Sequence, residues 1–306
     1  MKQTILTWID ASRYSSVATA DQRSVDWLRI IPFLFLHLAC LAVIWVGVSE
    51  VAVIAFLVSY LVRMFAITAF YHRYFSHRAF KTSRPVQFIF ALVGAAATQR
   101  GPLWWAAHHR EHHRKADQKD DPHSPKHGFL WSHMGWFLSR QHFKTDEQRI
   151  PDLMAYPELQ WLDRFALAVP VLYAVFWFGL GWVLNAFMPT LGTSSWQMLI
   201  WGYFISTVVL IHATLTINSL AHVWGKRRYE TRDDSRNNFW LALLTLGEGW
   251  HNNHHHYPGS ARQGFFWWEI DLSYYLLKLM SWCGLIWDLK PIPEKIRQTR
   301  RLRAPA

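Results

Sequence analysis

Histidine is concentrated in one short stretch of the sequence, Trp104–Pro125, in which His108, His109, His112 and His113 fall close together. Positions i, i+3 and i+4 of a helix lie on one face, so His109, His112 and His113 are predicted to point their imidazoles at one spot. Neutral imidazole is the commonest side-chain metal ligand. The spacing therefore predicts a metal site, and a solvated histidine-rich helix face is the alternative.

Three further histidine patterns accompany this one: an HxxxxH, a second HxxHH and a single histidine. Their members are His72 and His77, then His251, His254 and His255, and His222. Residues five apart on a regular helix point in different directions, so the helix is expected to end or bend within HxxxxH. Together with the first HxxHH they make nine candidate ligands. One metal takes about four to six ligands, so two metal ions are predicted.

Histidine must supply these ligands, because Cys40 and Cys283 lie in apolar runs and have no partner cysteine at a metal-binding spacing. Imidazole suits zinc, iron, copper and nickel, so the spacing alone does not select the metal. A metal-bound histidine usually donates its other ring N–H to a carboxylate or a carbonyl. Acidic residues near the histidines are therefore expected to hold the rings, and the candidates are Glu111, Asp121 and Glu248, with Asp117 and Asp233.

Composition indicates an all-α membrane protein. The chain is 51% hydrophobic and contains 19 Trp and 20 Phe, with only 17% charged residues, which is typical of proteins embedded in lipid. A bilayer is crossed by roughly 20 apolar residues. Four segments are predicted spans. One segment too short to cross is expected at the interface or as a re-entrant helix, and one aromatic, amphipathic segment is expected along the membrane surface. The four spans are 28–48, 51–71, 165–185 and 196–217, and the two surface segments are 86–98 and 267–289.

The distribution of charge predicts the topology. The net charge of +11 would suit nucleic acid or a membrane surface, and the apolar segments favour the membrane over nucleic acid. Lys and Arg mark the cytoplasmic side, and all of them except Arg63 lie outside the predicted spans or at their ends. Arg63 lies inside a predicted span, where it is expected to snorkel to the interface, with a position facing the protein interior as the alternative. A single domain, 1–306, is predicted, with two helical hairpins, cytoplasmic termini and a cytoplasmic helical cap at 72–164 and 218–306. Residues 1–27 lack the apolar core of a cleavable signal peptide.

The histidine motifs resemble those of the membrane fatty-acid desaturases. HRYFSH, HHREHH and HNNHH, with the single histidine in NSLAHVWG, occur in the same order relative to the span pairs, and the acyl-CoA Δ9 desaturases and their bacterial relatives are the most similar group. The resemblance extends from about Leu28 to Leu289. It implies a di-iron centre with nine histidine ligands, and Asn218 reaching a metal through water. These ligands are His72, His77, His109, His112, His113, His222, His251, His254 and His255.

The resemblance also implies a reaction, the O2-dependent introduction of a cis double bond, expected at Δ9, into a long saturated acyl chain. Side-chain acids and bases cannot remove hydrogen from an unactivated methylene, so the two iron ions would supply the oxidising power. The sequence contains no flavin, nicotinamide or iron–sulfur motif. Electrons are therefore expected from a separate ferredoxin, rubredoxin, cytochrome b5 or dedicated reductase. Such an oxidoreductase is expected in a bacterial inner membrane, with its active site cytoplasmic.

The motifs say less about how the substrate is recognised than about the metal ligands. Gln99, Trp105 and Arg140 are the candidate substrate-binding residues. Ala107-His108 stands where animal acyl-CoA desaturases have an Arg-Asp pair, and Arg100-Gly101 stands where they have Asn-Asp. The carrier of the acyl chain is therefore open among CoA, acyl carrier protein and a membrane phospholipid. His108 is one position off the ligand face and is expected to pack or to face the substrate.

The sequence also predicts where the histidines outside the motifs lie. His37 and His212, inside spans, are expected to bond to neighbouring helices, whereas His123 and His133 lie outside the cluster spacings and are expected at the surface or behind the ligands.

Three other functions are alternatives to a desaturase. A membrane di-iron hydroxylase or alkane monooxygenase has similar motifs and is the nearest alternative. A metal transporter would place its ligands near the middle of the membrane. A zinc hydrolase normally uses one metal and fewer ligands.

Overall fold

Helices dominate the computed structural model, which describes residues 6, 8–13, 25–27 and 30–302. Within this part of the chain the sheet consists of two short antiparallel strands, β1 (Lys81–Thr82) and β2 (Ile286–Trp287). The predicted helical fold class is confirmed in this coarse form. The start of the predicted first span, residues 28–29, and both ends of the chain lie outside the described residues.

Three helices are long and apolar enough to cross a membrane, Glu50–Ser76, Ala168–Phe187 and Ser195–Val223. They correspond to the second, third and fourth predicted spans. The predicted first span is interrupted, because the chain turns at Leu41 and Ala42 between two shorter helices. The segments that build these four regions are α2 (Ile31–Cys40), α3 (Val43–Val46), α4 (Glu50–Phe65), η2 (Ala66–Ser76), α9 (Ala168–Phe187), α10 (Ser195–Leu199), η8 (Ile200–Ile205), α11 (Ser206–Asn218) and α12 (Leu220–Val223).

The remaining helices are shorter. The longest are α5 (Arg84–Ala95), which is the apolar segment expected at the membrane surface or as a re-entrant helix, and α6 (Pro102–Lys115), which carries the first HxxHH. The others are η1 (Ala11–Arg13), η3 (Pro125–His127), η4 (Trp131–Gly135), α7 (Trp136–Leu138), η5 (Arg140–His142), η6 (Glu147–Arg149), α8 (Pro157–Arg164), η7 (Pro189–Leu191), α13 (Phe239–Leu244), α14 (His251–His256), α15 (Leu272–Trp282) and α16 (Glu294–Gln298).

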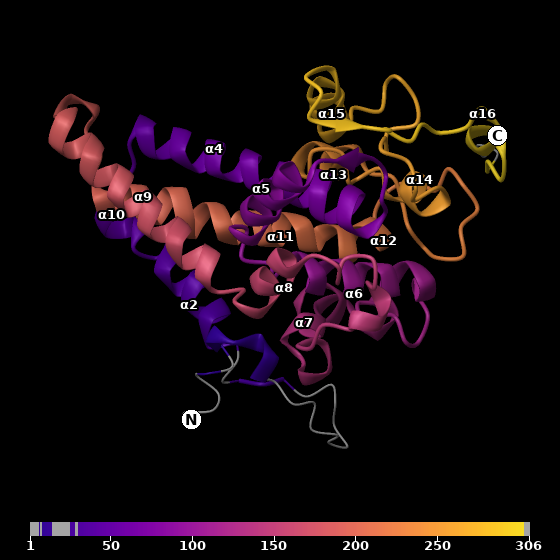
Figure 1. Ribbon diagram of the computed structural model, residues 1–306, viewed down its shortest axis with the longest axis horizontal. Helices are drawn as coiled ribbons and strands as arrows, with labels where there is room; N and C mark the ends of the chain where they lie inside the picture. Colours follow the sequence, from indigo (N-terminus) through magenta and orange to yellow (C-terminus); the bar gives the residue numbers. More distant parts are fainter. Residues whose placement is uncertain (1–5, 7, 14–24, 28–29, 303–306) are drawn as a thin grey trace.

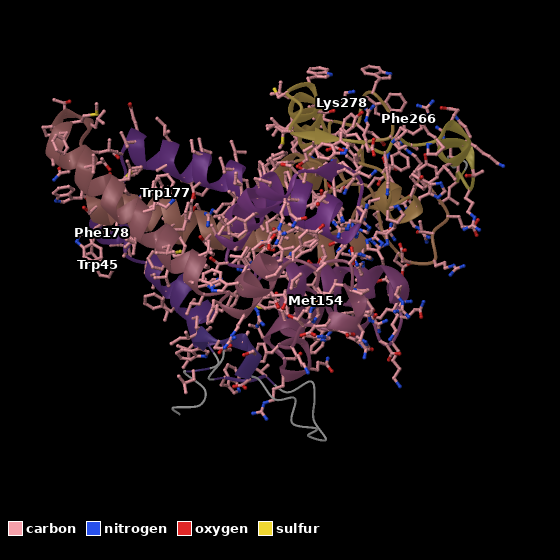
Figure 2. The ribbon with its side chains drawn as sticks, in the orientation of Figure 1. Trp45, Met154, Trp177, Phe178, Phe266 and Lys278 are labelled. Carbon is pink, nitrogen blue, oxygen red and sulfur yellow. The ribbon has the colours of Figure 1, made fainter. Side chains whose placement is uncertain are left out.

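The long apolar helices and the short polar ones occupy opposite ends of the molecule (Figure 1). Trp45 and Phe178 mark the apolar end, where carbon dominates the side chains, whereas nitrogen-rich side chains gather at the other end (Figure 2). On α9, Leu172 is 65% exposed and Trp182 is 60% exposed. Exposed apolar surface on this scale would be unfavourable in water and fits contact with lipid.

Polar contacts fasten the apolar helices to one another at defined points. Ser49 caps α4 by accepting the Ala52 N–H at 3.1 Å, and its hydroxyl donates to Gln197 of α10 at 2.6 Å. The beginnings of these two membrane-length helices are thereby joined. A capping interaction of this kind contributes about 1 kcal/mol to helix stability.

Arg63 is buried inside the protein, so the expectation that it snorkels is wrong. Its guanidinium donates to the Ala96 carbonyl at 3.0 Å and to the hydroxyls of Ser206 and Thr207 at 2.5 and 2.6 Å, and its side chain has no exposed surface. Uncharged acceptors on α5 and α11 thus surround this cation. Its position ties α4 to both helices beneath the histidine-bearing end.

Candidate metal centre

The nine candidate ligand histidines lie together in two adjacent groups, whose ligand nitrogens are all within 4.8 Å of one another within each group. We call them the five-histidine group and the four-histidine group. The five-histidine group comprises His72, His77, His109, His113 and His254, and the four-histidine group comprises His112, His222, His251 and His255. Two groups with four or five nitrogen donors each are what two metal ions require.

Each HxxHH motif is divided between the two groups. On α6, His109 and His113 enter the five-histidine group while His112 enters the four-histidine group. On α14 the division is reversed: His254 belongs to the five-histidine group, and His251 and His255 belong to the four-histidine group. Consecutive residues of a helix point about 100° apart, so the adjacent histidines of a motif diverge. The prediction that all three rings of one motif point at one spot is wrong, and each helix instead contributes to both groups.

A widened helix brings His72 and His77 together. The segment η2 is a π-helix in which each residue bonds to the fifth one before it, and the His77 N–H donates to the His72 carbonyl at 3.3 Å. The ring centroids of the two histidines are 4.9 Å apart. The wide turn brings residues five apart together, and η2 ends at Ser76, between the two histidines, as the spacing predicted. Such π-helical turns are rare and occur preferentially at functional sites.

The distances between ring nitrogens fit metal coordination. The Nε2 atoms of His77 and His109 are 2.8 Å apart, and His254 Nε2 lies 3.0 Å from that of His72 and 2.9 Å from that of His113. Two nitrogens bound to one metal at about 2.1 Å, at a right angle, are separated by about 3.0 Å. In the four-histidine group, His222 Nε2 and His251 Nε2 are 3.0 Å apart, and His112 Nε2 and His255 Nε2 are 3.4 Å apart. Both groups therefore bring ring nitrogens as close together as the ligands of one metal.

Four of these rings contact a carboxylate through Nδ1. In the four-histidine group, Nδ1 of His222 donates to Asp117 at 3.0 Å and Nδ1 of His255 donates to Asp233 at 2.9 Å. Such contacts fix the proton on Nδ1 and leave the Nε2 lone pair for a metal. The two remaining contacts have the same form and join His112 Nδ1 to Asp121 at 3.0 Å, and His72 Nδ1 to Glu248.

Glu111 has a different role from the one expected. Its carboxylate forms ion pairs with Lys115 and Arg149, both at 2.9 Å, on the outer face of α6. Because Glu111 precedes His112 by one position, its side chain points about 100° away from that ring. The sequence interpretation of Glu111 as a histidine partner is therefore corrected.

Burial keeps most of the rings uncharged. Desolvation, reinforced by neighbouring histidines, lowers the pKa of five rings well below the ordinary value for His, and these are His77, His109, His113, His251 and His254. Burial opposes ionisation of Asp121 too, but His112 and His123 keep the pKa of that carboxyl below its ordinary value. A neutral imidazole keeps a nitrogen lone pair free for a metal, so these five rings are in the protonation state that binds one.

A buried ion-pair network stabilises one of these carboxylates. Arg73 on η2 has 1% of its surface exposed, and its guanidinium contacts Glu248 at 3.1 Å and Asp271 at 3.0 Å. Gln263 donates to the second oxygen of Glu248 at 2.9 Å. Sequence reasoning missed Arg73, whose only signal was its position beside His72 in HRYFSH.

An apolar cavity of about 230 Å³ adjoins the centre, and residues of α2, α6, α7, α9 and α11 line it. His109 and Asn218 lie in its wall, and Asn218 also borders a smaller cavity lined by histidines of both groups. Trp105 and Gln99 also line the larger, apolar cavity. The Trp105 ring stacks on His109 with centroids 4.9 Å apart, and its indole N–H donates to Gln99 at 3.4 Å.

Two other residues have positions that bear on substrate recognition. His108 is buried in the cavity wall, with Nδ1 donating to the Trp104 carbonyl at 2.9 Å, and belongs to neither histidine group. Arg140 lies at the surface, 3.9 Å from Asp26, with a side chain that is 47% exposed. It is not among the described residues that line the cavity. The expectation that Arg140 contacts substrate thus finds no support in its position.

The chain matches a family model described as fatty acid desaturase over residues 49–277, which include all nine histidines. The chain belongs to the fatty acid desaturase family. The family resemblance seen in the histidine motifs is confirmed, and the protein is an oxidoreductase. One relative of this desaturase, the sn-2 palmitoyl-lipid 9-desaturase of Nostoc sp., is 36% identical over 265 residues, which cover 85% of this chain and 88% of the relative.

Other relatives differ in the acyl carrier that their names give. The sn-1 stearoyl-lipid 9-desaturase of Anabaena variabilis is 34% identical to this desaturase, covering 92% of this chain and 99% of the relative. An acyl-CoA 5-desaturase of Anemone leveillei is 33% identical, covering 90% of this chain and 83% of the relative. Family membership alone therefore leaves the carrier and the position of the double bond open.

Proposed function

We propose that this desaturase uses two iron ions and O2 to introduce a cis double bond at Δ9 of a long saturated acyl chain carried by a membrane lipid. The observation that carries the proposal is the apolar cavity, whose wall includes His109 and Asn218. A saturated chain has no polar group to bind, so its recognition requires an apolar cavity of this kind. The nine histidines would hold the two irons, and Asn218 would reach one of them through water.

The bound irons would supply the oxidising power for removing hydrogen from the chain, and the protein's part is to place one pair of carbons beside them. Trp105 is suited to this role, because its ring stacks on His109 while its N–H is fixed by Gln99. Gln99 is itself held by a hydrogen bond to Thr214 on α11 at 3.0 Å. Together they form a rigid wall at the point where the chain would pass the metal centre.

Two observations support a lipid carrier over CoA. Ala107 and His108 stand where the animal acyl-CoA desaturases have a charged pair, and both are buried. His108 donates from Nδ1 to the Trp104 carbonyl, and burial lowers its pKa and so favours its neutral form, so neither residue presents a charge to a nucleotide. Two relatives that align with more than four fifths of this chain are named as desaturases of lipid-bound chains.

We further propose that the chain is one membrane domain with four spans, α2 and α3 forming the first. Trp201 of the fourth span donates to the Gly47 carbonyl at 2.9 Å, and Gln197 donates to the Val46 carbonyl at the same distance. These bonds join the end of α3 to the helix Ser195–Val223, which forms the fourth span. The basic histidine-bearing end would face the cytoplasm of a bacterial cell.

Electrons would enter at a surface depression beside the five-histidine group. His77 and His113 line it together with the basic residues Arg110, Arg114 and Arg149. Here the ligand rings come close to the surface, so a carrier docked in the depression would have a short path to the metal. Basic side chains at its rim would attract a donor with an acidic surface, such as a ferredoxin, rubredoxin, cytochrome b5 or reductase domain.

Expression in a host that lacks the activity, together with an acidic electron donor, tests the proposal. We expect new Δ9 double bonds in membrane lipids, and none with His112→Ala, which removes one ligand of the four-histidine group. Purified protein should then convert a phospholipid carrying a labelled saturated chain, and leave the same chain on CoA unchanged. Conversion of the CoA ester alone would contradict the lipid carrier while leaving the desaturase intact.

The competing functions give different results in the same experiment. Hydroxylated lipids or alkanes without new double bonds would indicate a hydroxylase. Metal analysis of the purified protein separates the other two, since we expect about two iron ions per chain from the two histidine groups. One zinc ion without O2 consumption would favour a hydrolase, and metal uptake into vesicles would favour a transporter.

A further inference from the structure

Three histidines outside the metal centre form a hydrogen-bonded row, which we call the histidine row. His37 Nε2 on α2 lies 2.9 Å from His212 Nε2 on α11, and His212 Nδ1 lies 3.0 Å from His133 Nε2 on η4. The row ends at Ser219, whose hydroxyl is 3.0 Å from His133 Nδ1, and at the Phe33 carbonyl, 2.8 Å from His37 Nδ1. The bonds of His37 and His212 to neighbouring helices agree with the sequence expectation, and His133 extends them to a third segment.

The direction of these bonds is determined by one end. The Phe33 carbonyl only accepts, so His37 must donate to it from Nδ1 and can accept at Nε2. His212 then donates from Nε2 and accepts at Nδ1, and His133 donates to it from Nε2. Three neutral rings satisfy the contacts between rings in this arrangement, whereas the Ser219 hydroxyl lies 3.0 Å from both His133 Nδ1 and the Leu215 carbonyl and can donate to one of them at a time. Hydrogen bonds between half-buried rings make the packing of the segments that carry them more specific.

The row joins the segments that form the wall of the apolar cavity. Phe33 from α2, Leu215 from α11 and Phe137 from α7 line that cavity, and each lies within one helical turn of a row histidine or its bonded partner. The rings of Phe33 and Phe137 also contact each other edge to face, with centroids 5.5 Å apart. The distance between these walls therefore depends on the lengths of the bonds in the row.

We infer that the histidine row is a positioning device that fixes the cavity wall and thereby selects which carbons of the acyl chain reach the metal centre. The inference rests on the proposed function, because it requires an acyl chain in the cavity. A row with one nitrogen contact between successive rings does not gather three donors around one point, so it lacks the form of a third metal site. Its end at a backbone carbonyl, which carries no exchangeable proton, also distinguishes it from a proton path.

The test compares His212→Leu, which removes the central ring, with Thr216→Val on the same helix. Thr216 bonds only within its helix, to the Ala213 carbonyl at 2.6 Å, and does not line the cavity. The readouts are the position of the new double bond and the ratio of 16- to 18-carbon products, with iron content measured alongside. For His212→Leu we expect minor positional isomers to rise about tenfold at unchanged iron content, as the loss of two half-buried hydrogen bonds predicts. Thr216→Val should match the wild type.

His133→Gln is the second variant, used if His212→Leu does not fold, because His133 lies outside the membrane-length helices. The same rise in minor isomers supports the inference. An unchanged isomer pattern in a folded, iron-containing variant overturns it. Wild-type protein that makes no double bonds overturns the proposed function instead, so the two failures are distinguishable. The relative thermal stabilisation by saturated 16- and 18-carbon lipids gives a check that does not depend on turnover: the variant should lose the wild-type preference.

Discussion

Asp117 accepts a hydrogen bond from Nδ1 of His222 at 3.0 Å, although 105 residues separate the two in the sequence. Asp117 has a φ of 58°, in the left-handed region that residues other than glycine rarely adopt. Its carboxylate also accepts the Asp234 N–H at 2.6 Å, and its own N–H donates to Asp121 at 2.8 Å. Backbone strain of about 1–3 kcal/mol is thus tolerated where it places a carboxylate beside a ring of the four-histidine group.

Replacement of Asp117 by Asn should weaken metal binding in the four-histidine group by about 10- to 100-fold. Asn tolerates the left-handed backbone, so the variant removes the charge behind His222 without adding strain. Iron content after dialysis against graded chelator concentrations measures the effect. Asp120→Asn is the matched control, since the Asp120 side chain is 71% exposed and contacts only Lys115 among the ion pairs of the described residues. Equal chelator resistance of Asp117→Asn and wild type would refute the role assigned to Asp117.

Replacement of Arg73 by Met should destabilise the protein by about 3–5 kcal/mol, because it leaves Glu248 and Asp271 buried without their cation. Arg78→Met removes a cation only a few positions along the chain, from a partly exposed pair with Asp152, and should cost about 1 kcal/mol or less. Thermal unfolding in detergent compares the two variants with the wild type. Similar losses in both would show that the buried network contributes no more than a surface pair.

Acid should reduce the stability contributed by Asp152 in a defined pH range. Burial alone would raise the pKa of this carboxyl, but Arg110 and Arg78 outweigh it and lower the pKa to about 2. The unfolded-state value is about 3.9. The ionised form is therefore favoured in the folded protein, and its contribution is complete above about pH 5 and declines as the pH falls from about 4 to 2.

The difference in unfolding midpoint between the wild type and Asp152→Asn measures this contribution. We expect a constant difference from about pH 5 to 8 and a smaller one below about pH 4. A difference that grows as the pH falls would have the wrong sign for a carboxyl with a lowered pKa.

Reversal of charge at the surface depression should weaken electron-donor binding. Arg114 lines the depression with a side chain that is 61% exposed, so Arg114→Glu is expected to raise the KM for an acidic donor about tenfold at low salt, with kcat nearly unchanged. The difference should shrink as salt screens the charges. Lys295→Glu on α16, an exposed lysine outside the depression, is the control. An equal effect of both substitutions would indicate attraction by the whole basic surface.

The sequence reveals the candidate donors of the centre but not their distribution. Histidine spacing and the family resemblance pointed to the nine rings that the structure brings together, because each motif is local in the chain. The division of each HxxHH between two groups depends on how α6 and α14 face each other, which no local pattern encodes. The π-helical turn at His72 and the burial of Arg63 likewise follow from packing against distant helices. Asp121 and Glu248 were recognised as candidates near the motifs, whereas Glu111, equally near, points to the opposite face of its helix.

The division of the two HxxHH motifs has a consequence for biosynthesis. His254 belongs to one group, and His251 and His255 belong to the other, so neither group is complete until the ribosome has made α14. A nascent chain that ends before this helix holds only partial sets of donors. Assembly of the centre is then a late step, and truncation before His254 would leave both groups short of a donor rather than one complete and one missing.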